Sequence, residues 1–240
     1  MAQKSIFITG VSSGIGHGLA AEYLQRGDTV YGVSRREPHN LTAHEKFHFA
    51  ELDLTDYEKM APVCKTLLHN TTELDLVVLN AGILSPIRDM VETPLEDLRQ
   101  AMEINVWANK MLLDWLLQSG RTVRQVVGIS SGAAVNGHRG WNGYSLSKAA
   151  LNMLIQLYAA ERPDIHFTAL APGLIDTDMQ AYMSGLSKDE RFPSIEALKN
   201  ARGTAAMPTP DAAAPLLIKA FDKVKAFENG GFTDVRELRD

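Results

Sequence analysis

Short apolar runs alternate with segments of helical spacing along almost the whole chain, and this pattern narrows the fold more than any other feature. The runs have the length of buried strands, and the apolar residues between them recur every three or four positions, as on one face of a helix. Strands that alternate with helices form a mostly parallel sheet with helices on both faces. We therefore predict one doubly wound α/β domain over residues 1–240, with seven strands at 5–9, 29–34, 46–52, 74–79, 124–131, 165–171 and 232–235.

The composition fits a globular protein and argues against several other classes. Apolar residues make up 45% of the chain, the formal net charge is −5, and no block of Lys and Arg suggests a nucleic acid or an anionic membrane as partner. No window approaches the roughly 20 apolar residues that span a bilayer, and the first residues lack the apolar stretch of a signal peptide. The single cysteine, Cys64, excludes an internal disulfide, and the seven histidines show no metal-ligand spacing. We expect a soluble, cytoplasmic protein without a metal site.

A glycine-rich turn joins the first predicted strand to the first predicted helix. Glycines in such a turn let the backbone approach a diphosphate, and the N–H groups at the helix start then face the phosphates. The residues predicted to contact a dinucleotide here are Gly10, Ser12, Ser13, Gly14, Ile15 and Gly16. The spacing G-x-x-x-G-x-G differs from the G-x-G-x-x-G fingerprint, so this motif alone would also fit an ordinary glycine-rich loop.

The end of the second predicted strand bears on the choice of cofactor. In dinucleotide-binding folds an acidic residue about 20 positions after the glycines binds the ribose 2′-hydroxyl. This chain has Ser34, Arg35 and Arg36 there, so no carboxylate repels a 2′-phosphate and two guanidiniums could bind one. The turn predicts a preference for NADP(H) over NAD(H), and the alternative is a solvated basic turn.

Two further groups of residues follow strand ends. Asp53 and Leu54 come after the third strand, where the Asp53 carboxylate could face an adenine amino group or serve as a loop or capping carboxylate. Asn80, Ala81 and Gly82 come after the fourth strand, and small residues there let a flat ligand lie against the backbone. Ligands of doubly wound sheets bind at the carboxyl ends of the strands, so we expect these groups to face one site.

A serine, a tyrosine and a lysine follow the fifth predicted strand. Ser131 ends the strand, Tyr144 comes thirteen positions later, and Lys148 lies one helical turn beyond Tyr144. An ordinary tyrosine has a pKa of about 10, and we predict that the nearby ammonium lowers the pKa of Tyr144. The phenol could then transfer a proton at neutral pH. A Tyr–Lys pair at this spacing is also common on solvated helices.

Asn105 lies among apolar residues in a predicted helix that starts near Thr93 and ends at Gly120. One interpretation is a core amide whose hydrogen bonds are satisfied. The other is a kinked turn that frees a backbone carbonyl for a bound water.

The chain resembles the short-chain dehydrogenase/reductase family in the order and spacing of motifs that cover nearly its whole length. Residues 9–16 match the T-G-x-x-x-G-x-G cofactor loop, 80–82 match N-A-G, and 172–177 match the P-G-x-x-x-T run beside the nicotinamide. A departure is Leu79, where many members have Asn, and we expect no loss of function from it. The resemblance implies a tetrad of Asn105, Ser131, Tyr144 and Lys148, with further cofactor contacts from Tyr144, Lys148, Pro172, Gly173, Ile175 and Thr177. It also implies a Rossmann-type sheet of order 3-2-1-4-5-6-7 and a homodimer or homotetramer formed through the long helices.

The resemblance implies reversible hydride transfer between NADP(H) and a carbonyl or alcohol. Tyr144 would be the general acid, Ser131 would orient the substrate oxygen, Lys148 would also bind the ribose hydroxyls, and Asn105 would hold a water that relays protons. The combination SSGAA…GWxGY…APGxxDTDMQ is similar to the sepiapterin reductase-like and benzil reductase-like branch, whose members reduce a ketone beside a second carbonyl. We expect NADPH-dependent reduction of a ketone, with a 1,2-diketone as a candidate substrate.

The substrate pocket is predicted from residues near the tetrad. Contacts are expected from Ser131, Ala133, Trp141, Tyr144, Leu174 and Met179. Trp141 could be a wall of the pocket or could only pack in the core. Residues 174–207 could form a substrate-binding lid, in which Met179, Tyr182 and Met183 either cover the substrate or make core contacts under a loop.

Two other classes of protein share part of the pattern. A dinucleotide-binding sensor without turnover would keep the glycine-rich loop but would be expected to lack part of the tetrad, which is complete here. A methyltransferase also uses a glycine-rich turn, but it would be expected to show an acid where Ser34 and Arg35 stand.

Overall fold

The computed structural model describes residues 3–238 and contains a parallel sheet of seven strands. The order is β3-β2-β1-β5-β7-β8-β9, and each neighbouring pair is parallel. The strands are β1 (Ser5–Thr9), β2 (Thr29–Ser34), β3 (Phe47–Glu51), β5 (Leu76–Leu79), β7 (Gln125–Ile129), β8 (His166–Ala171) and β9 (Phe232–Asp234). The predicted doubly wound fold and its strand order are confirmed. The order reverses between β1 and β5, the place where ligands bind in such sheets.

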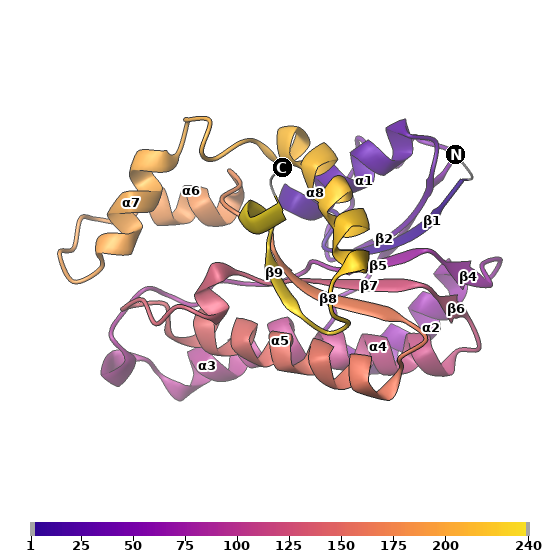
Figure 1. Cartoon of the computed structure of the whole chain (residues 1–240), viewed down its shortest axis with the longest axis horizontal. Coiled ribbons are helices and arrows are strands. Elements are labelled where there is room, and N and C mark those ends of the chain that lie inside the picture. Colours follow the sequence, from indigo (N-terminus) through magenta and orange to yellow (C-terminus); the bar gives the residue numbers. More distant parts are fainter. Residues whose placement is uncertain (1–2, 239–240) are drawn as a thin grey trace.

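Helices cover both faces of the sheet, as Figure 1 shows. On one face, α1 (Gly14–Gln25) packs against α8 (Pro210–Lys223). The other face carries α2 (Tyr57–Leu67), α4 (Ala108–Gln118) and α5 (Asn142–Glu161). The crossover helices therefore fix both sides of the sheet and leave the carboxyl ends of the strands open.

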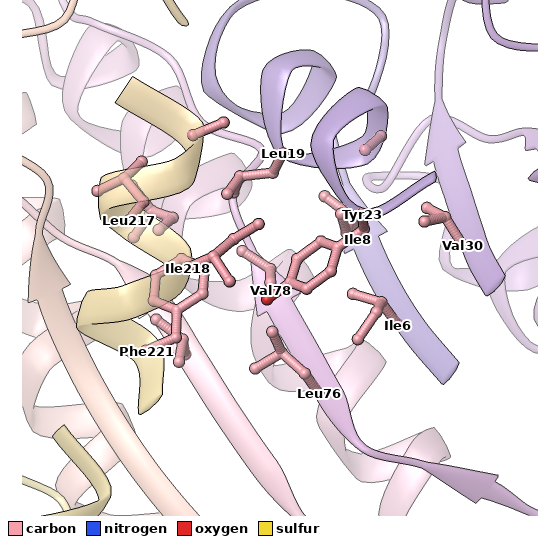
Figure 2. Close-up of a cluster of buried hydrophobic side chains, with 14 of the residues drawn as sticks. Ile6, Ile8, Leu19, Tyr23, Val30, Leu76, Val78, Leu217, Ile218 and Phe221 are labelled. Atoms are coloured by element: carbon pink, nitrogen blue, oxygen red, sulfur yellow. The ribbon is translucent and has the colours of Figure 1, made fainter. Parts of the chain in front are cut away.

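The alternation of side chains along β1 explains the two cores. Ile6 and Ile8 join the cluster under α1 and α8, whereas Phe7 between them joins the cluster under α2, α4 and α5. Figure 2 shows the first cluster, to which Leu19 of α1 and Phe221 of α8 both belong. Each of these side chains is almost fully buried, and such burial contributes roughly 1.5–3 kcal/mol per residue.

Two of the predicted strands differ from the observed ones. The run 74–79 is divided into β4 (Glu73–Leu74) and β5, because Asp75 turns its carboxylate to accept the backbone N–H of Ser5 at 2.8 Å. The run 124–131 contains only β7, and β6 (Thr122–Val123) precedes it. β4 and β6 pair with each other as a separate two-stranded sheet.

The long helix predicted up to Gly120 consists of three parts. α3 (Leu95–Met102) is followed by a π-helical turn, η2 (Glu103–Trp107), and then by α4. A π turn adds a residue to the helical ring and frees a backbone group, and such turns are frequent at functional sites. The kinked turn expected around Asn105 is therefore present.

Residues 174–207 are more regular than the sequence indicates. They contain α6 (Asp178–Ser184) and α7 (Pro193–Ala201), which project from the main body of the molecule (Figure 1). The remaining elements are 3-10 turns: η1 (Met90–Glu92), η3 (Gly132–Ala134), η4 (Val224–Ala226) and η5 (Val235–Leu238). Within residues 3–238 no helix has the length and apolarity needed to cross a bilayer, and no three His, Cys, Asp or Glu side chains are grouped so that they could hold a metal ion.

Candidate active site

A cleft of about 1110 Å³ lies along the carboxyl ends of the strands. It is larger than the roughly 300–1,000 Å³ of a typical small-molecule site. Of the residues predicted from the sequence, Gly16 and Asn105 do not line it because both are buried behind it, and Tyr182 of α6 does not line it because its side chain is exposed. The others are Gly10, Ser12, Ser13, Gly14, Ile15, Ser34, Arg35, Arg36, Asp53, Leu54, Asn80, Ala81, Gly82, Ser131, Ala133, Trp141, Tyr144, Lys148, Pro172, Gly173, Leu174, Ile175, Thr177, Met179 and Met183.

The glycine-rich turn leaves its backbone accessible at one end of the cleft. Gly10 has a φ of +76°, a value that side chains disfavour, and a Cβ on Gly16 would lie 2.4 Å from the Gly10 carbonyl oxygen. The side chain of Ser13, the N-cap of α1, makes no capping hydrogen bond. The first N–H groups of α1 therefore remain available to an anion at the helix start, where the helix dipole also favours negative charge.

A hydrogen-bonded brace holds this turn against the neighbouring strand. The amide of Asn80 donates to the carbonyl oxygens of Thr9 at 2.9 Å and of Gly10 at 3.2 Å. The hydroxyl of Thr9 accepts the backbone N–H groups of Asn80 at 2.9 Å and Ala81 at 3.0 Å. The segment 80–82 thus sets the shape of the glycine-rich turn in addition to lining the cleft.

The basic turn after β2 borders the same cleft. Ser34 is buried and its hydroxyl donates to the carbonyl oxygen of Arg36 at 2.7 Å, whereas Arg35 and Arg36 are exposed. Asp53 accepts the backbone N–H of Thr55 at 3.0 Å and its hydroxyl at 2.8 Å. These bonds lower the pKa of Asp53, and the positive charge of Arg35 lowers it further. Asp53 is therefore a loop carboxylate that also lines the cleft.

Ser131, Tyr144 and Lys148 come together at the other end of the cleft. Ser131 follows the end of β7, and its hydroxyl accepts the backbone N–H of Ala133 at 3.1 Å. It also hydrogen-bonds to the side chain of Tyr144, which lies in the first turn of α5. Lys148 is buried one turn further along α5, with its Nζ 5.7 Å from the centre of the Tyr144 ring. The fold thus brings a hydroxyl, a phenol and an ammonium to one place.

The pKa of Tyr144 differs from the value expected from the sequence. Burial raises the pKa of Tyr144, and the hydrogen bond with Ser131 lowers it by less. Burial lowers the pKa of Lys148 to about 8. The prediction that Lys148 lowers the pKa of Tyr144 is wrong, because desolvation of the phenol outweighs the other effects.

Asn105 is a core amide whose side-chain hydrogen bonds are satisfied, which was one of the two interpretations made from the sequence. Its side chain accepts the N–H of Ile83 at 2.8 Å, and donates to the Ile83 carbonyl oxygen at 3.0 Å and to the Ser147 hydroxyl at 2.9 Å. It is therefore a satisfied core amide within the π turn. Its own carbonyl oxygen accepts the side-chain amide of Asn109 at 2.9 Å.

Trp141 connects α5 to the segment 174–207. Its indole N–H donates to the hydroxyl of Ser194 in α7 at 2.8 Å, and its ring centre lies 5.9 Å from that of Tyr144. It packs with Met179 against a small apolar cluster built on Met183, Phe192 and Ile195. Trp141 and Met179 therefore line the cleft and pack in a core at the same time.

A cluster of charges, which we call the lid latch, holds the segment 174–207 against the body of the protein. Asp89 accepts a bidentate hydrogen bond from Arg139, at 2.5 and 2.8 Å, and a further bond from Arg191 at 3.0 Å. These bonds, that of Arg139 foremost, lower the pKa of Asp89. Arg191 also pairs with Asp189 at 2.8 Å, and its guanidinium lies over the ring of Phe192. The latch therefore connects three loops around the cleft.

Sequence reasoning missed several residues of the cleft. Arg99 and Gln100 of α3, Leu198 of α7, and Asp234 and Arg236 near the carboxyl terminus also line it. Asp234 and Arg236 could have been found, because they follow the carboxyl end of the last strand, where ligands bind in such sheets. Leu198 of α7 lies within the predicted lid 174–207, whereas nothing in the sequence pattern indicates that α3 reaches the cleft.

Comparison with known proteins supports the resemblance to the short-chain dehydrogenase/reductase family. The family model described as short chain dehydrogenase matches residues 4–185. A benzil reductase, (S)-benzoin forming, of Bacillus subtilis is 31% identical over 245 residues, covering 96% of this chain and 98% of that protein. A short chain dehydrogenase/reductase structure from Saccharomyces cerevisiae superposes with a TM-score of 0.83 at 24% identity, covering 97% of this chain and 96% of that one. The structure of ElxO with NADP bound has a TM-score of 0.80 at 24% identity, covering 98% and 97%.

The match to the family model extends over most of the chain and includes the glycine-rich turn, the tetrad and the segment 172–177. The alignment with the relative from Bacillus subtilis covers nearly the full length of both proteins at 31% identity. The relationship is therefore not confined to the cofactor loop. The sheet order and the cleft at its carboxyl edge are those expected for such an enzyme. The chain therefore belongs to the short chain dehydrogenase family and is an oxidoreductase that acts on CH–OH or C=O groups.

Proposed function

We propose that this enzyme reduces ketones with NADPH, and that ketones with a second carbonyl beside the first are its preferred substrates. The observation that carries the proposal is the convergence of Ser131, Tyr144 and Lys148 at one end of the cleft, opposite a glycine-rich turn and two arginines at the other end. The similarity to a benzil reductase along the whole chain supports the diketone as substrate.

The residues at the substrate end of the cleft have different roles in the reaction. Bound NADPH supplies the hydride that the carbonyl carbon receives. Tyr144 donates its proton to the carbonyl oxygen as negative charge develops there, and its raised pKa keeps the phenol protonated for this step. Ser131, already bonded to Tyr144, donates a hydrogen bond to the same oxygen and holds it in position. Lys148 binds the ribose hydroxyls, and the carbonyl of Asn105 holds a water that returns protons through Lys148.

The choice of NADPH rests on the turn after β2. Arg35 and Arg36 are exposed at the rim of the cleft, and the buried side chain there is Ser34, which carries no charge to repel a 2′-phosphate. The related fold of ElxO holds NADP in its solved structure. The uncapped first turn of α1 provides donors for the diphosphate.

The segment 174–207 acts as a lid over the substrate. Trp141, Met179 and Met183 present apolar surface to the cleft, which suits an aromatic or aliphatic ketone. The lid latch at Asp89 and the bond between Trp141 and Ser194 hold the lid closed over this surface. Closure excludes water from the reacting carbonyl.

We also propose that the enzyme is a homo-oligomer. Large apolar side chains are exposed on the π turn, α4 and α5: Trp107, Met111, Leu146, Met153 and Leu157. α4 and α5 lie side by side, since the hydroxyl of Tyr158 bonds to Asp114 at 2.5 Å. A second copy of the chain that presents the same helices would cover this surface symmetrically.

The experiment that tests the function follows NADPH and NADH oxidation at 340 nm with a panel of ketones. We expect turnover of benzil with NADPH, slower turnover with NADH, and weaker activity on ketones with one carbonyl. Tight NADPH binding without turnover of any carbonyl compound would contradict the proposal and favour a nucleotide-binding sensor.

A further inference from the structure

The carboxyl-terminal segment places an arginine at the edge of the cleft, at its substrate end, with 61% of its side chain exposed. Arg236 lies in η5, two residues after β9 ends. Its Nη2 atom is 3.7 Å from the point that a Cβ on Gly132 would occupy. Gly132 follows Ser131, the residue that holds the reacting oxygen in the proposed function. The guanidinium is therefore next to the place where the substituent beyond the reacting carbonyl must lie.

The arginine is held in this position by a neighbouring carboxylate. Asp234 is buried and accepts Nε of Arg236 at 2.8 Å, Nη2 at 2.6 Å and the backbone N–H at 2.9 Å. The two side-chain bonds use two of the five N–H donors of the guanidinium. Within residues 3–238, no other hydrogen bond of this guanidinium is found. The remaining donors are available to a ligand, and the fixed orientation reduces the entropy lost when one binds.

The surroundings of Arg236 indicate what kind of group it can bind. The cleft is also lined by the apolar side chains of Trp141, Leu174 and Met179. The amide nitrogen of Asn136 lies as near to Gly132 as the guanidinium does, but it already donates to the carbonyl oxygen of Gly132 at 2.9 Å. The carboxylate of Asp234 lies 2.6 Å from Arg236 and would repel a second carboxylate placed beside the pair. A neutral acceptor oxygen is attracted by the guanidinium dipole without that repulsion. The pair therefore favours a carbonyl or ether oxygen over an acid.

From this geometry we infer that Arg236 is a specificity-determining residue, which donates a hydrogen bond to a neutral acceptor oxygen on the carbon next to the reacting carbonyl. In a 1,2-diketone this acceptor is the second carbonyl oxygen. The inference rests on the proposed ketone reduction and deepens it, because it names the residue that distinguishes a diketone from a simple ketone.

The test compares benzil with deoxybenzoin, which has a CH₂ group in place of the second carbonyl. The Arg236→Met variant should lose roughly 10–100-fold in kcat/KM for benzil, the amount expected for one hydrogen bond from a charged group. Its kcat/KM for deoxybenzoin should stay within about threefold, since that ketone has no acceptor to lose. Each ratio of variant to parent cancels the different intrinsic reactivity of the two ketones.

Arg162→Met is the matched control. Arg162 makes the same bidentate pair with an aspartate two residues away, Asp164, at 3.0 and 2.8 Å, and it does not line the cleft. Its loss should leave both ketones within about twofold of the parent enzyme. Equal losses on benzil and deoxybenzoin in Arg236→Met, or no loss on either, would overturn the inference.

Two further measurements distinguish a failure of this inference from a failure of the proposed function on which it rests. Binding of benzil to the NADP⁺-loaded Tyr144→Phe variant, measured by calorimetry, should weaken when Arg236→Met is added, whether or not the enzyme turns over. If the parent enzyme reduces neither ketone, the proposed reduction fails and this binding measurement still decides the role of Arg236. Phenylglyoxylate provides the last arm, because a larger loss on this acid than on benzil would show that Arg236 binds a carboxylate.

Discussion

The ammonium of Lys148 donates a hydrogen bond to the backbone carbonyl of Ile129, with 2.7 Å between Nζ and the oxygen. Ile129 is the last residue of β7, so the bond ties α5 to the strand that leads into Ser131. Burial is the cause that lowers the pKa of Lys148 to about 8. The lysine of the proposed tetrad is therefore positioned by the sheet and can lose its proton near neutral pH.

This pKa predicts a pH dependence of cofactor binding. The value lies below the ordinary 10.5 of lysine, so Lys148 is an ammonium below about pH 8 and becomes a neutral amine above it. We expect the dissociation constant of NADPH for Tyr144→Phe to rise as the pH increases from 7 to 10, by at most about tenfold per pH unit for one proton. Fluorescence titration measures this dissociation constant. The Tyr144→Phe variant is used because it lacks the phenol, whose own titration would otherwise contribute to the pH dependence. The same rise of the dissociation constant with pH in the Tyr144→Phe/Lys148→Met double variant would show that Lys148 is not the group that titrates.

Removal of the Tyr144 hydroxyl should stop the reaction without removing the cofactor. Phe at position 144 keeps the ring contact with Trp141, but it has no proton to give to the developing oxyanion. We expect kcat to fall by about 10²–10⁴-fold, the usual contribution of a general acid. The dissociation constant of NADPH should stay within about twofold. Turnover close to that of the parent enzyme would exclude Tyr144 as the acid.

Substitution of Arg35 should separate the two cofactors. Its guanidinium is exposed at the rim of the cleft, and it is close enough to Asp53 to lower the pKa of that carboxyl. In Arg35→Ala we expect NADPH to bind roughly 10–100-fold more weakly, because a bond between two charged groups is lost, and NADH to change by less than about threefold. Arg26→Ala, at the far end of α1, is the control and should affect neither. Equal weakening of both cofactors by Arg35→Ala would place the 2′-phosphate elsewhere.

The lid latch depends on one carboxylate between two arginines. Asp89→Asn removes the negative charge and leaves Arg139 and Arg191 facing each other. We expect faster hydrogen exchange in residues 185–192 and a several-fold higher KM for ketones, with unfolding behaviour close to that of the parent enzyme. Asp164→Asn breaks a similar bidentate pair away from the lid and serves as the control. Unchanged exchange in 185–192 would show that the apolar contacts of Phe192 alone hold the lid.

The proposed subunit interface can be tested by introducing a charged side chain into it. Leu157 is exposed on α5, so Leu157→Glu should leave the monomer folded and place charges against each other at a symmetric contact. We expect light scattering to report a dimer or tetramer for the parent chain and a smaller species for the variant. Leu216→Glu, an equally exposed leucine on α8, is the control and should not change the mass. A monomeric parent chain would refute the interface.

Much of the candidate site was predictable because its residues follow strand ends. Gly10, Asn80, Ser131 and Thr177 each stand just beyond a buried run, and parallel strands bring their carboxyl ends to one edge of the sheet. A kinked turn at Asn105 was one of two interpretations of a polar residue in an apolar helix, and the structure has a π turn there. Arg236 was missed although the same rule covers it, because no motif marks a single arginine near the end of a chain.

The strand order was implied by the resemblance to the short-chain dehydrogenase/reductase family, whereas the sequence by itself determined the alternation of strands and helices and the residues that meet at the carboxyl edge. Local periodicity and glycine placement carry that information. Only the tertiary structure decided the direction of the Tyr144 and Lys148 pKa shifts, because desolvation depends on what covers a side chain and not on which residues precede it. It also decided the lid latch and the position of Arg236, since contacts between Asp89 and Arg191, or between Arg236 and Gly132, join residues about a hundred positions apart. Such pairings arise from packing, and no local pattern in the chain encodes them.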